Sequence, residues 1–302
     1  MNSSLTKNAR HEISFSGWFP IVSVIFGCLT VISNLSIIVF IVIRKKRNGR
    51  PPKKPITWFV LSLAVSDFFV GSFCIPHKLI CEHMMECSDK VWEIFDIFIS
   101  FFHTASITNL SMISIDRYIS AVHPYFYRRS ICHRSWFLIL LSWILSILQE
   151  IPYLISILSD SYPQADTVDT ITKLIFMGIL PPIVMTYTYI RVWLVLRKHK
   201  KAIKEQANQH LSPRQLKAPL DIKKREILLL TVGIMDAIYI VCSVLFQYVV
   251  ICYLLWNSCH TSYLTEKIVF TVLYFHSLPN SLIYAFVGRL FCNKESGCCS
   301  LP

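Results

Sequence analysis

The sequence predicts an all-α membrane protein, a bundle of seven transmembrane helices with the N-terminus outside and the C-terminus inside. Its 302 residues are 54% hydrophobic and 16% charged, and the mean hydropathy is +0.50. A soluble domain usually carries about 25% charged residues, so this chain is too apolar to fold in water. The apolar residues come in long blocks, and most basic residues fall in the gaps between those blocks.

Seven apolar blocks define the expected helices, because a helix needs about 20 apolar residues to cross the hydrocarbon core. They cover approximately residues 18–43, 56–80, 92–121, 135–158, 171–196, 226–254 and 263–287. The third block is interrupted by Asp96, His103 and Asn109, and the sixth contains Asp236. Polar groups in a span usually face the interior of the bundle, so we expect these side chains to point inward.

The basic residues set the orientation of the bundle, because Lys and Arg accumulate in cytoplasmic loops. More than two thirds of the 30 Lys and Arg lie in the gaps 44–54, 128–134 and 197–225 or after the seventh block. We place these segments inside, which leaves for the outer side Lys7, Arg10, Lys78, Lys90, Lys173 and Lys267. We therefore expect an extracellular N-terminus over 1–17, a membrane domain over 18–291, a cytoplasmic tail over 292–302, and residence in the plasma membrane.

The remaining charges and motifs exclude several function classes. A net charge of +12 would suggest a nucleic-acid partner for a soluble protein, but here the charge lies in inner loops, where it fixes topology or meets acidic lipid. The acids at the expected outer face form either a cation-attracting mouth or a solvated loop surface. No Walker loop, GxSxG or HExxH motif occurs, so we expect no enzyme.

Asp116 and Arg117 lie side by side at the inner end of the third block. An arginine there can extend its charge toward the membrane surface, but it points into a bundle. Asp116 can hold that charge in one state, and in another state Arg117 is free to meet neighbouring helices. The pair is therefore a candidate two-state contact that ligand binding at the outer face would bias.

Several motifs, in order along residues 18–291, resemble the rhodopsin-like (class A) G-protein-coupled receptors. Asp116-Arg117-Tyr118 followed by "ISAVHP" resembles the DRY motif and second inner loop of that family, and "TASITNLSMISIDRY" (104–118) is similar to the third helix of its biogenic-amine receptors. Further matches are Asn34 in the first helix, Asp67 in "LSLAVSDFFVG" (61–71), Trp143 in the fourth, Pro181 and Tyr189 in the fifth, and "NSLIYAF" (280–286) in the seventh.

The resemblance implies a receptor that passes the signal of an extracellular ligand, in this subfamily a small amine, to a heterotrimeric G protein. It implies that Asp116, Arg117 and Tyr118 act in activation, with Tyr189 and Tyr284 as partners of Arg117; interfacial anchoring is the alternative for these two tyrosines. Two other functions stay open: a receptor fold with atypical or absent G-protein coupling, and a transporter or channel, although no internal repeat supports the latter.

The resemblance also implies a polar network around Asp67, with no cofactor other than a bound sodium ion. Its expected members are Asn34, Asp67, Ser106, Ser277 and Asn280. Hard cations favour such oxygen ligands. The alternative is a neutral, hydrogen-bonded Asp67 that packs against Asn34.

The chain departs from the family pattern in the sixth and seventh helices. Ser243 replaces the family's tryptophan and Leu245 its proline, so the sixth helix loses the usual cause of a kink. Ser281 stands where the seventh helix normally has proline, and Pro279 lies two places earlier.

The usual disulfide cannot form either. Trp92 occupies the third-helix cysteine position, and the loop over 153–170 contains no cysteine. Cys252 with Cys259, and Cys81 with Cys87, are pairs that the sequence leaves open.

The aspartate that binds amines in the family is replaced by Ile99. Asp96, or Glu150 in the fourth helix, could serve a cationic ligand instead, or each could have an outward-facing or packing role. The other pocket candidates by position are Ser100, His103, Phe246, Gln247 and Tyr274. Near the termini, Cys292, Cys298 and Cys299 are candidates for palmitoylation and Asn2 for glycosylation.

Overall fold

Six helices of the computed structural model are long and apolar enough to cross a membrane, and each coincides with one of the expected blocks. They are Pro20–Ile43, Pro55–Cys81, Lys90–Val122, Ser135–Leu158, Thr167–Ala202 and Glu226–Cys252. The structure describes residues 19–48, 55–83, 87–127, 129, 132–159, 162–207, 217–254, 265, 268–269, 271–272 and 275–281. The expected seventh helix is therefore described only in part, with helical backbone at 265, 268–269, 271–272, 275 and 277–281.

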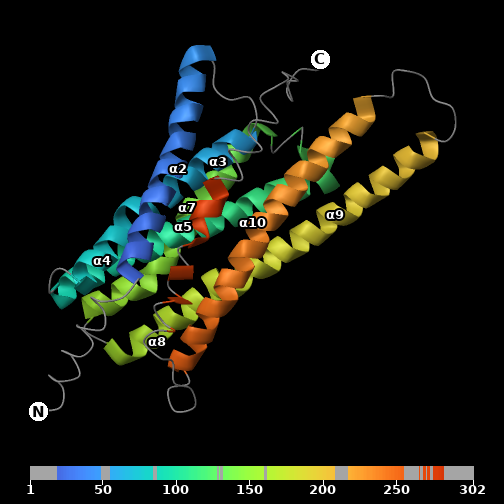
Figure 1. Ribbon diagram of the computed structural model, residues 1–302. Helices are drawn as coiled ribbons and strands as arrows, with labels where there is room; N and C mark the ends of the chain where they lie inside the picture. Colours follow the sequence, from blue (N-terminus) through green and yellow to red (C-terminus); the bar gives the residue numbers. More distant parts are fainter. Residues whose placement is uncertain are drawn as a thin grey trace, which may run out of the picture.

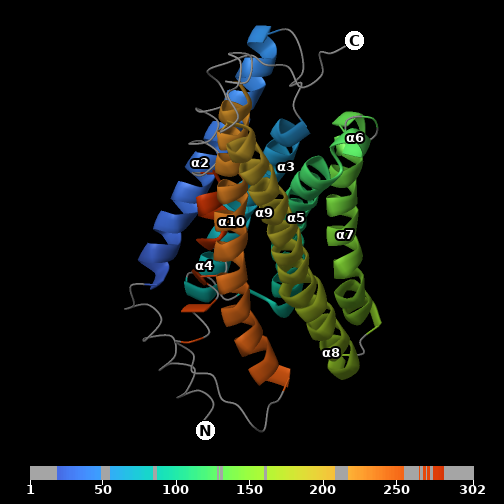
Figure 2. The same cartoon turned by 90° about the vertical axis from the view of Figure 1, so that its right-hand side faces the viewer.

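The described elements are all helical (Figure 1). In chain order they are α2 (Phe19–Asn48), α3 (Pro55–Phe69), η1 (Val70–Cys74), α4 (Ile75–His83), α5 (Asp89–Val122), α6 (Pro124–Phe126), α7 (Cys132–Ser159), α8 (Tyr162–Lys173), η3 (Leu174–Ile179), α9 (Leu180–Ala207) and α10 (Lys217–Leu254). Two of them, η1 and η3, are π-helical turns that join the helices on either side into one span. The short α6 and the helix α8 lie at opposite ends of the bundle (Figure 2), which we call the α6 end and the α8 end.

The helix α5 forms the centre of the bundle. Two thirds of its membrane window (67%) is buried, against 22% for the windows in α2 and α7. The main apolar core surrounds it and includes Phe59, Leu63, Ile107, Leu110 and Tyr239. Exposed apolar side chains cover the outer faces of the other helices, for example Ile32 at 62%, Trp136 at 61% and Val241 at 61% exposure. An apolar outer surface of this extent fits lipid and not water.

The π-helical turns both lie directly before prolines. Proline has no N–H, so it leaves the carbonyl four residues earlier without its helical partner. Pro181 and Pro182 in this way free the carbonyls of Met177 and Gly178 in η3. Both carbonyls are used by α10: the Tyr239 hydroxyl donates to Met177, and the Gln247 amide donates to Gly178. The carbonyls that the prolines leave unpaired in η3 therefore bind α10 by hydrogen bonds.

The helix α10 behaves as its sequence predicts. With Leu245 in place of a proline, it continues as α-helix over 38 residues without a π-helical turn. It lies beside α9 (Figure 1). Close packing is possible at Gly233, because a Cβ there would collide with the ring of Tyr189. The helix thus packs as one continuous α-helix against α9 at Gly233 and against η3 at Tyr239 and Gln247.

Candidate functional site

At the α6 end, Asp116 and Arg117 form the ionic contact that the sequence predicts. The Arg117 Nε donates to Asp116 Oδ2 at 3.0 Å, and a second guanidinium nitrogen donates to the same oxygen. The Asp116 carboxylate is fully buried, while the Arg117 side chain is 17% exposed. Backbone geometry places the pair one and a half turns before the end of α5 at Val122, so the guanidinium can reach the membrane surface.

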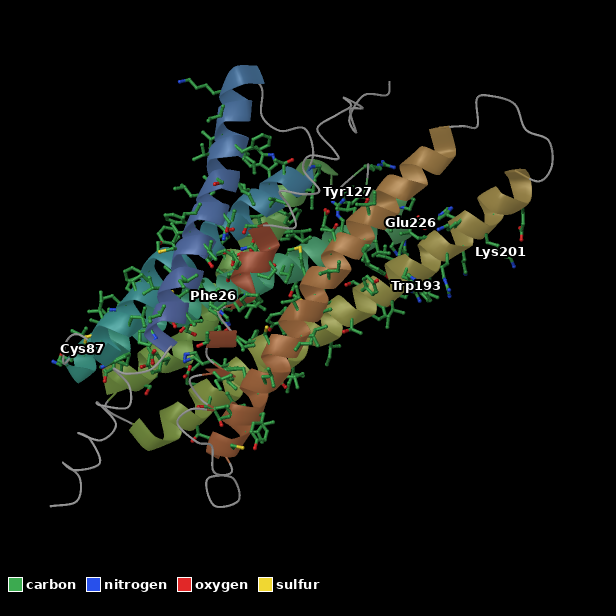
Figure 3. The ribbon with its side chains drawn as sticks, in the orientation of Figure 1. Phe26, Cys87, Tyr127, Trp193, Lys201 and Glu226 are labelled. Atoms are coloured by element: carbon green, nitrogen blue, oxygen red, sulfur yellow. A yellow bond between two sulfur atoms is a disulfide. The ribbon has the colours of Figure 1, made fainter. Side chains whose placement is uncertain are left out.

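Tyr127 completes this cluster, and the sequence did not single it out. Its hydroxyl donates to the other carboxylate oxygen, Asp116 Oδ1, at 2.9 Å. The chain reverses at His123 and Pro124, and the one-turn helix α6 brings Tyr127 back against α5 (Figure 3). The proline of "HPYFY" predicts a turn, but only the geometry of that turn shows that Tyr127, and not Tyr125, reaches Asp116.

Tyr118 and Tyr189, to which the resemblance assigns a role in activation, pack against a second cluster at the same end. Tyr118 and Tyr189 both lie against Val192, Leu196 and Leu229. The Tyr118 ring is 5.9 Å from that of Tyr187. Tyr189 of α9 therefore packs against α10 at Leu229 and Gly233, and its expected partnership with Arg117 stays a prediction. Tyr284 lies outside the described residues.

Asp67 lies at the centre of a polar network in mid-bundle, and it is fully buried. The Ser106 hydroxyl donates to Oδ1 at 2.5 Å, and the Asn280 amide donates to Oδ2 at 3.1 Å. The Ser277 hydroxyl lies close to the Asp67 carboxylate, yet its Oγ completes no hydrogen bond with a described residue. The four residues bring together oxygen atoms from α3, α5 and the seventh segment.

The network differs from the expectation at two positions. Asn34 is buried, but its amide donates to Thr30 of its own helix at 2.9 Å. His276, which the sequence did not single out, places Nε2 3.5 Å from the Ser106 hydroxyl. Its ring lies 4.9 Å from that of His103 and 5.8 Å from that of Tyr239. The sequence could have pointed to His276 through the adjacent Ser277, because a residue next to a member of the Asp67 network lies in the same part of the bundle.

Ser281, where proline was expected, forms a hydrogen bond to α2. Its hydroxyl donates to Ser33 at 2.7 Å. The proline position has thus become a polar contact between the first and seventh segments.

A further buried carboxylate, Asp236, connects α5 and α10. The Ser114 hydroxyl approaches its two oxygens at 3.1 and 3.0 Å. Asp236, His103 and Asn109 are all buried, which confirms that these interruptions face inward. The same expectation for Asp96 is wrong, because that residue is exposed. It lies within two turns of the start of α5 at Asp89, where a carboxylate can reach water.

The predicted pocket residues lie toward the α8 end on three helices. Ile99 and Ser100 are half-buried on α5, His103 is buried below them, Glu150 is buried on α7, and Phe246 and Gln247 are half-buried on α10. Of these, Ser100 and Glu150 are brought together, and Asp96 acts on Glu150 electrostatically. Gln247 is directed to Gly178 and Ser243 instead. Tyr274 lies outside the described residues, as do Cys292, Cys298, Cys299 and Asn2.

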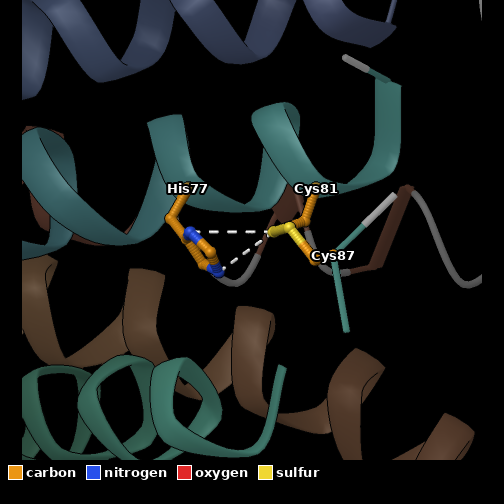
Figure 4. Close-up of a disulfide and its surroundings, with 3 residues drawn as sticks. All are labelled: His77, Cys81 and Cys87. Atoms are coloured by element: carbon orange, nitrogen blue, oxygen red, sulfur yellow. Dashed lines mark hydrogen bonds between the residues drawn. A yellow bond between two sulfur atoms is a disulfide. The ribbon is translucent and has the colours of Figure 1, made fainter. Parts of the chain in front are cut away.

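The α8 end also carries a disulfide between Cys81 and Cys87, with a Cα–Cα distance of 5.3 Å (Figure 4). It joins the end of α4 to the chain just before α5, and so selects one of the pairs that the sequence left open. The Cys81 sulfur lies 3.4 Å from His77 Nε2. Trp92, in place of the usual cysteine, packs its ring 6.0 Å from that of His77. Cys252 is also disulfide-bonded, to a partner outside the described residues.

The arrangement of apolar spans, the Asp116–Arg117 pair and the Asp67 network defines a class of protein. Residues 33–284 match the sequence profile of the 7 transmembrane receptor (rhodopsin family). The match covers most of the chain, so the protein belongs to this family. It is therefore a seven-helix membrane bundle and not an enzyme.

Individual relatives place it near the receptors for biogenic amines. Trace amine-associated receptor 9 of Mus musculus is 27% identical over 282 residues, which cover 85% of this chain and 77% of the relative. The Alpha-1A adrenergic receptor of Oryzias latipes is 25% identical over 312 residues, covering 88% and 63%. The D(1B) dopamine receptor of Homo sapiens is 41% identical over 95 residues, covering 30% and 19%.

Proposed function

We propose that the protein is a plasma-membrane receptor that transmits the binding of an extracellular ligand, a small amine, to a heterotrimeric G protein. The α8 end faces outside in this proposal. Two observations support that orientation: the disulfide at this end requires an oxidising compartment, and the basic gaps lie at the α6 end. The observation that carries the proposal is the cluster of Asp116, Arg117 and Tyr127 at the α6 end.

The cluster can act as a latch between two states. In the described state Asp116 neutralises Arg117, and Tyr127 keeps the carboxylate in place. A ligand that binds another helix arrangement more tightly shifts the population toward it, in proportion to its differential affinity. Arg117, once released, offers the donors of its guanidinium to acceptors on a partner protein.

The surface around α6 offers a place for that partner. Val122, His123, Pro124 and Arg129 line an open depression together with Tyr125 and Phe126. The Tyr125 and Phe126 side chains are 82% and 56% exposed. Exposed aromatic side chains beside an arginine are typical of protein interfaces, so this surface suits the G protein.

We also propose that the Asp67 network binds a sodium ion. The donor set fits a hard cation, because Asp67 and Ser106 supply a carboxylate and a hydroxyl, and the orphan Ser277 oxygen lies beside them. A bound cation would offset the buried negative charge. Replacing sodium by N-methylglucamine at constant ionic strength should lower the melting temperature of the wild type. Ser106→Ala should remove most of that sodium dependence, and an unchanged dependence would contradict the site.

A receptor fold with weak coupling is the second candidate, and the uninterrupted α-helical course of α10 favours it. Three contacts hold α10 to α9, and Asp236 and Ser114 hold it to α5. Without a proline kink, the α6 end of α10 has less freedom to swing outward.

Nucleotide exchange decides between these candidates. The full chain in lipid nanodiscs would be mixed with each of several purified heterotrimers, with and without a panel of amines. We expect exchange with at least one heterotrimer, and a loss of about tenfold in Arg117→Ala, since a charge-assisted contact is removed. Arg197→Ala, which removes an arginine stacked on Trp193, serves as the matched control. Normal amine binding without exchange would support the second candidate.

A further inference from the structure

Four buried oxygen atoms without a hydrogen-bond partner gather at one place in the α8 half of the bundle. They are Ser100 Oγ on α5, Gln149 Oε1 and Glu150 Oε2 on α7, and Asp169 Oδ1 on α8. None completes a hydrogen bond with a described residue in its present geometry, although the Ser100 hydroxyl lies close enough to donate to Glu150. Gln149, Glu150 and Asp169 are 1%, 6% and 6% exposed. Buried polar atoms are nearly always paired in folded proteins, so four exceptions at one place need a cause.

These atoms surround a single carboxylate. Ser100 lies beside Glu150, and Asp169 and Lys173 act on it electrostatically. The Gln149 amide nitrogen approaches Glu150 Oε1 at 3.4 Å, which leaves the amide oxygen unused. The helices that carry these residues pack against one another, with α7 in contact with both α5 and α8. We call Ser100, Gln149, Glu150 and Asp169 the acceptor cluster.

The region around the acceptor cluster carries more negative than positive charge. Asp96, Glu150 and Asp169 contribute three carboxylates to this region, and Lys173 contributes one ammonium group. Lys173 is already committed: its ammonium binds Asp169 Oδ2 at 2.7 Å and lies over the Tyr153 ring at 4.7 Å. A buried carboxylate without a nearby cation is costly, so a second cation is favoured here.

Three of the four orphan atoms, the Gln149 amide oxygen and the carboxylate oxygens of Glu150 and Asp169, only accept hydrogen bonds, and the Ser100 hydroxyl can accept as well as donate, so the missing group is a donor. A primary ammonium group carries one positive charge and three N–H donors. Each donor that reaches a buried orphan acceptor removes a desolvation cost of about 1–3 kcal/mol. The Lys173 side chain is 22% exposed, so the region opens toward the α8 end, from which a ligand can enter.

We propose that the acceptor cluster binds the ammonium group of a primary amine, with Glu150 as its counter-charge. Ser100, Gln149 and Asp169 then accept its hydrogen bonds. The ligand's ammonium group is thereby moved from α5, where Ile99 replaces the carboxylate, to the junction of α5, α7 and α8. The role of this site in signalling rests on the proposed receptor function, whereas binding itself does not.

Asp96 is the competing anchor, and its exposure argues against it. It is exposed near the start of α5, where water screens its charge. Glu150 is buried, so its attraction for a cation is much less screened. The two carboxylates act on each other, which makes them a matched pair for mutation.

Binding of three probes to the full chain in lipid nanodiscs tests the proposal. They are 2-phenylethylammonium, its N-trimethyl derivative with the same charge and no N–H donor, and the neutral 2-phenylethanol. We expect the primary ammonium to bind at least tenfold more tightly than the other two, because it alone supplies charge and donors. Binding of the trimethyl derivative as tightly as the primary amine would overturn the proposal, as would no primary-amine binding at millimolar concentration.

Variants assign the binding to a residue. Glu150→Gln keeps the shape of the side chain and should weaken 2-phenylethylammonium at least tenfold, whereas Asp96→Asn should change its affinity by about twofold or less. Gln149→Leu, which removes only an acceptor, should weaken binding by an intermediate factor. A larger loss in Asp96→Asn than in Glu150→Gln would place the anchor at Asp96 and refute ours. Intact binding without nucleotide exchange would refute the proposed signalling alone.

Discussion

Asp67 and Glu150 are both carboxylates buried inside the membrane bundle, but their surroundings differ. Each oxygen of Asp67 accepts a hydrogen bond, from Ser106 and from Asn280. Glu150 Oε2 accepts none from the described residues, and three more orphan oxygens lie around it. A satisfied carboxylate holds helices together, whereas an unsatisfied one marks a place where a further group belongs. Asp67 is thus tied into the bundle by its hydrogen bonds, with the Ser277 oxygen left for the proposed ion, whereas Glu150 marks a place for the ammonium group of a larger ligand.

The Asp116 cluster is satisfied like that of Asp67, so breaking it should have the largest cost. Asp116→Ala removes the carboxylate that both Arg117 and Tyr127 contact, and we expect it to lower the free energy of unfolding by about 3 kcal/mol. Freed Arg117 should also raise basal nucleotide exchange. Thermal unfolding in nanodiscs and an exchange assay without ligand measure the two effects. A stability equal to wild type would show that the satisfied cluster does not stabilise the bundle.

Asp236 is an intermediate case, because the single hydroxyl hydrogen of Ser114 faces both of its oxygens and can satisfy only one of them fully. Ser114→Ala leaves the carboxyl group without that donor and should cost about 2 kcal/mol. Adding Asp236→Leu should recover most of the loss, since the buried polar group is then gone. A double-mutant cycle on the melting curves reports the coupling. Purely additive effects would mean that the two residues do not interact.

Tyr127→Phe should give the smallest effect among the satisfied clusters. It removes one hydrogen bond to Asp116 and leaves the Arg117 contact, so we expect a loss of about 1 kcal/mol. Tyr125→Phe removes the hydroxyl of an exposed tyrosine two residues earlier and is the control, with no measurable change. If the control lost as much stability as Tyr127→Phe, the hydrogen bond would not be the cause.

The helices could be predicted from the sequence because membrane spans are long, continuous and apolar. Hydropathy located six spans within a few residues, and the absence of a proline foretold that α10 continues as one α-helix past Leu245. The Asp67 network came from motif resemblance, which supplies residues that meet across helices. The α10 contacts of Met177 and Gly178 were not predicted, because their partners Tyr239 and Gln247 depend on the rotation of α10.

Only two of the four residues of the acceptor cluster could be predicted from the sequence, because the positions of the others depend on how the helices pack. Glu150 stood out as a charge in an apolar block, and Ser100 as a neighbour of Ile99. Gln149 and Asp169 gave no signal, because one is adjacent to a more conspicuous acid and the other lies in what resembled a loop. The structure shows that this loop contains α8, which packs against α7 and brings Asp169 to Glu150.

The melting temperatures of Asp67→Asn and Glu150→Gln, measured side by side in nanodiscs without amine, test the central comparison most directly. Asp67→Asn replaces an acceptor of two hydrogen bonds by a group that must also donate, so we expect a lower melting temperature. Glu150→Gln removes a buried charge that has no ion pair of its own, since Lys173 binds Asp169, so we expect a melting temperature equal to or above that of wild type. Destabilisation by Glu150→Gln as great as that by Asp67→Asn would contradict the account.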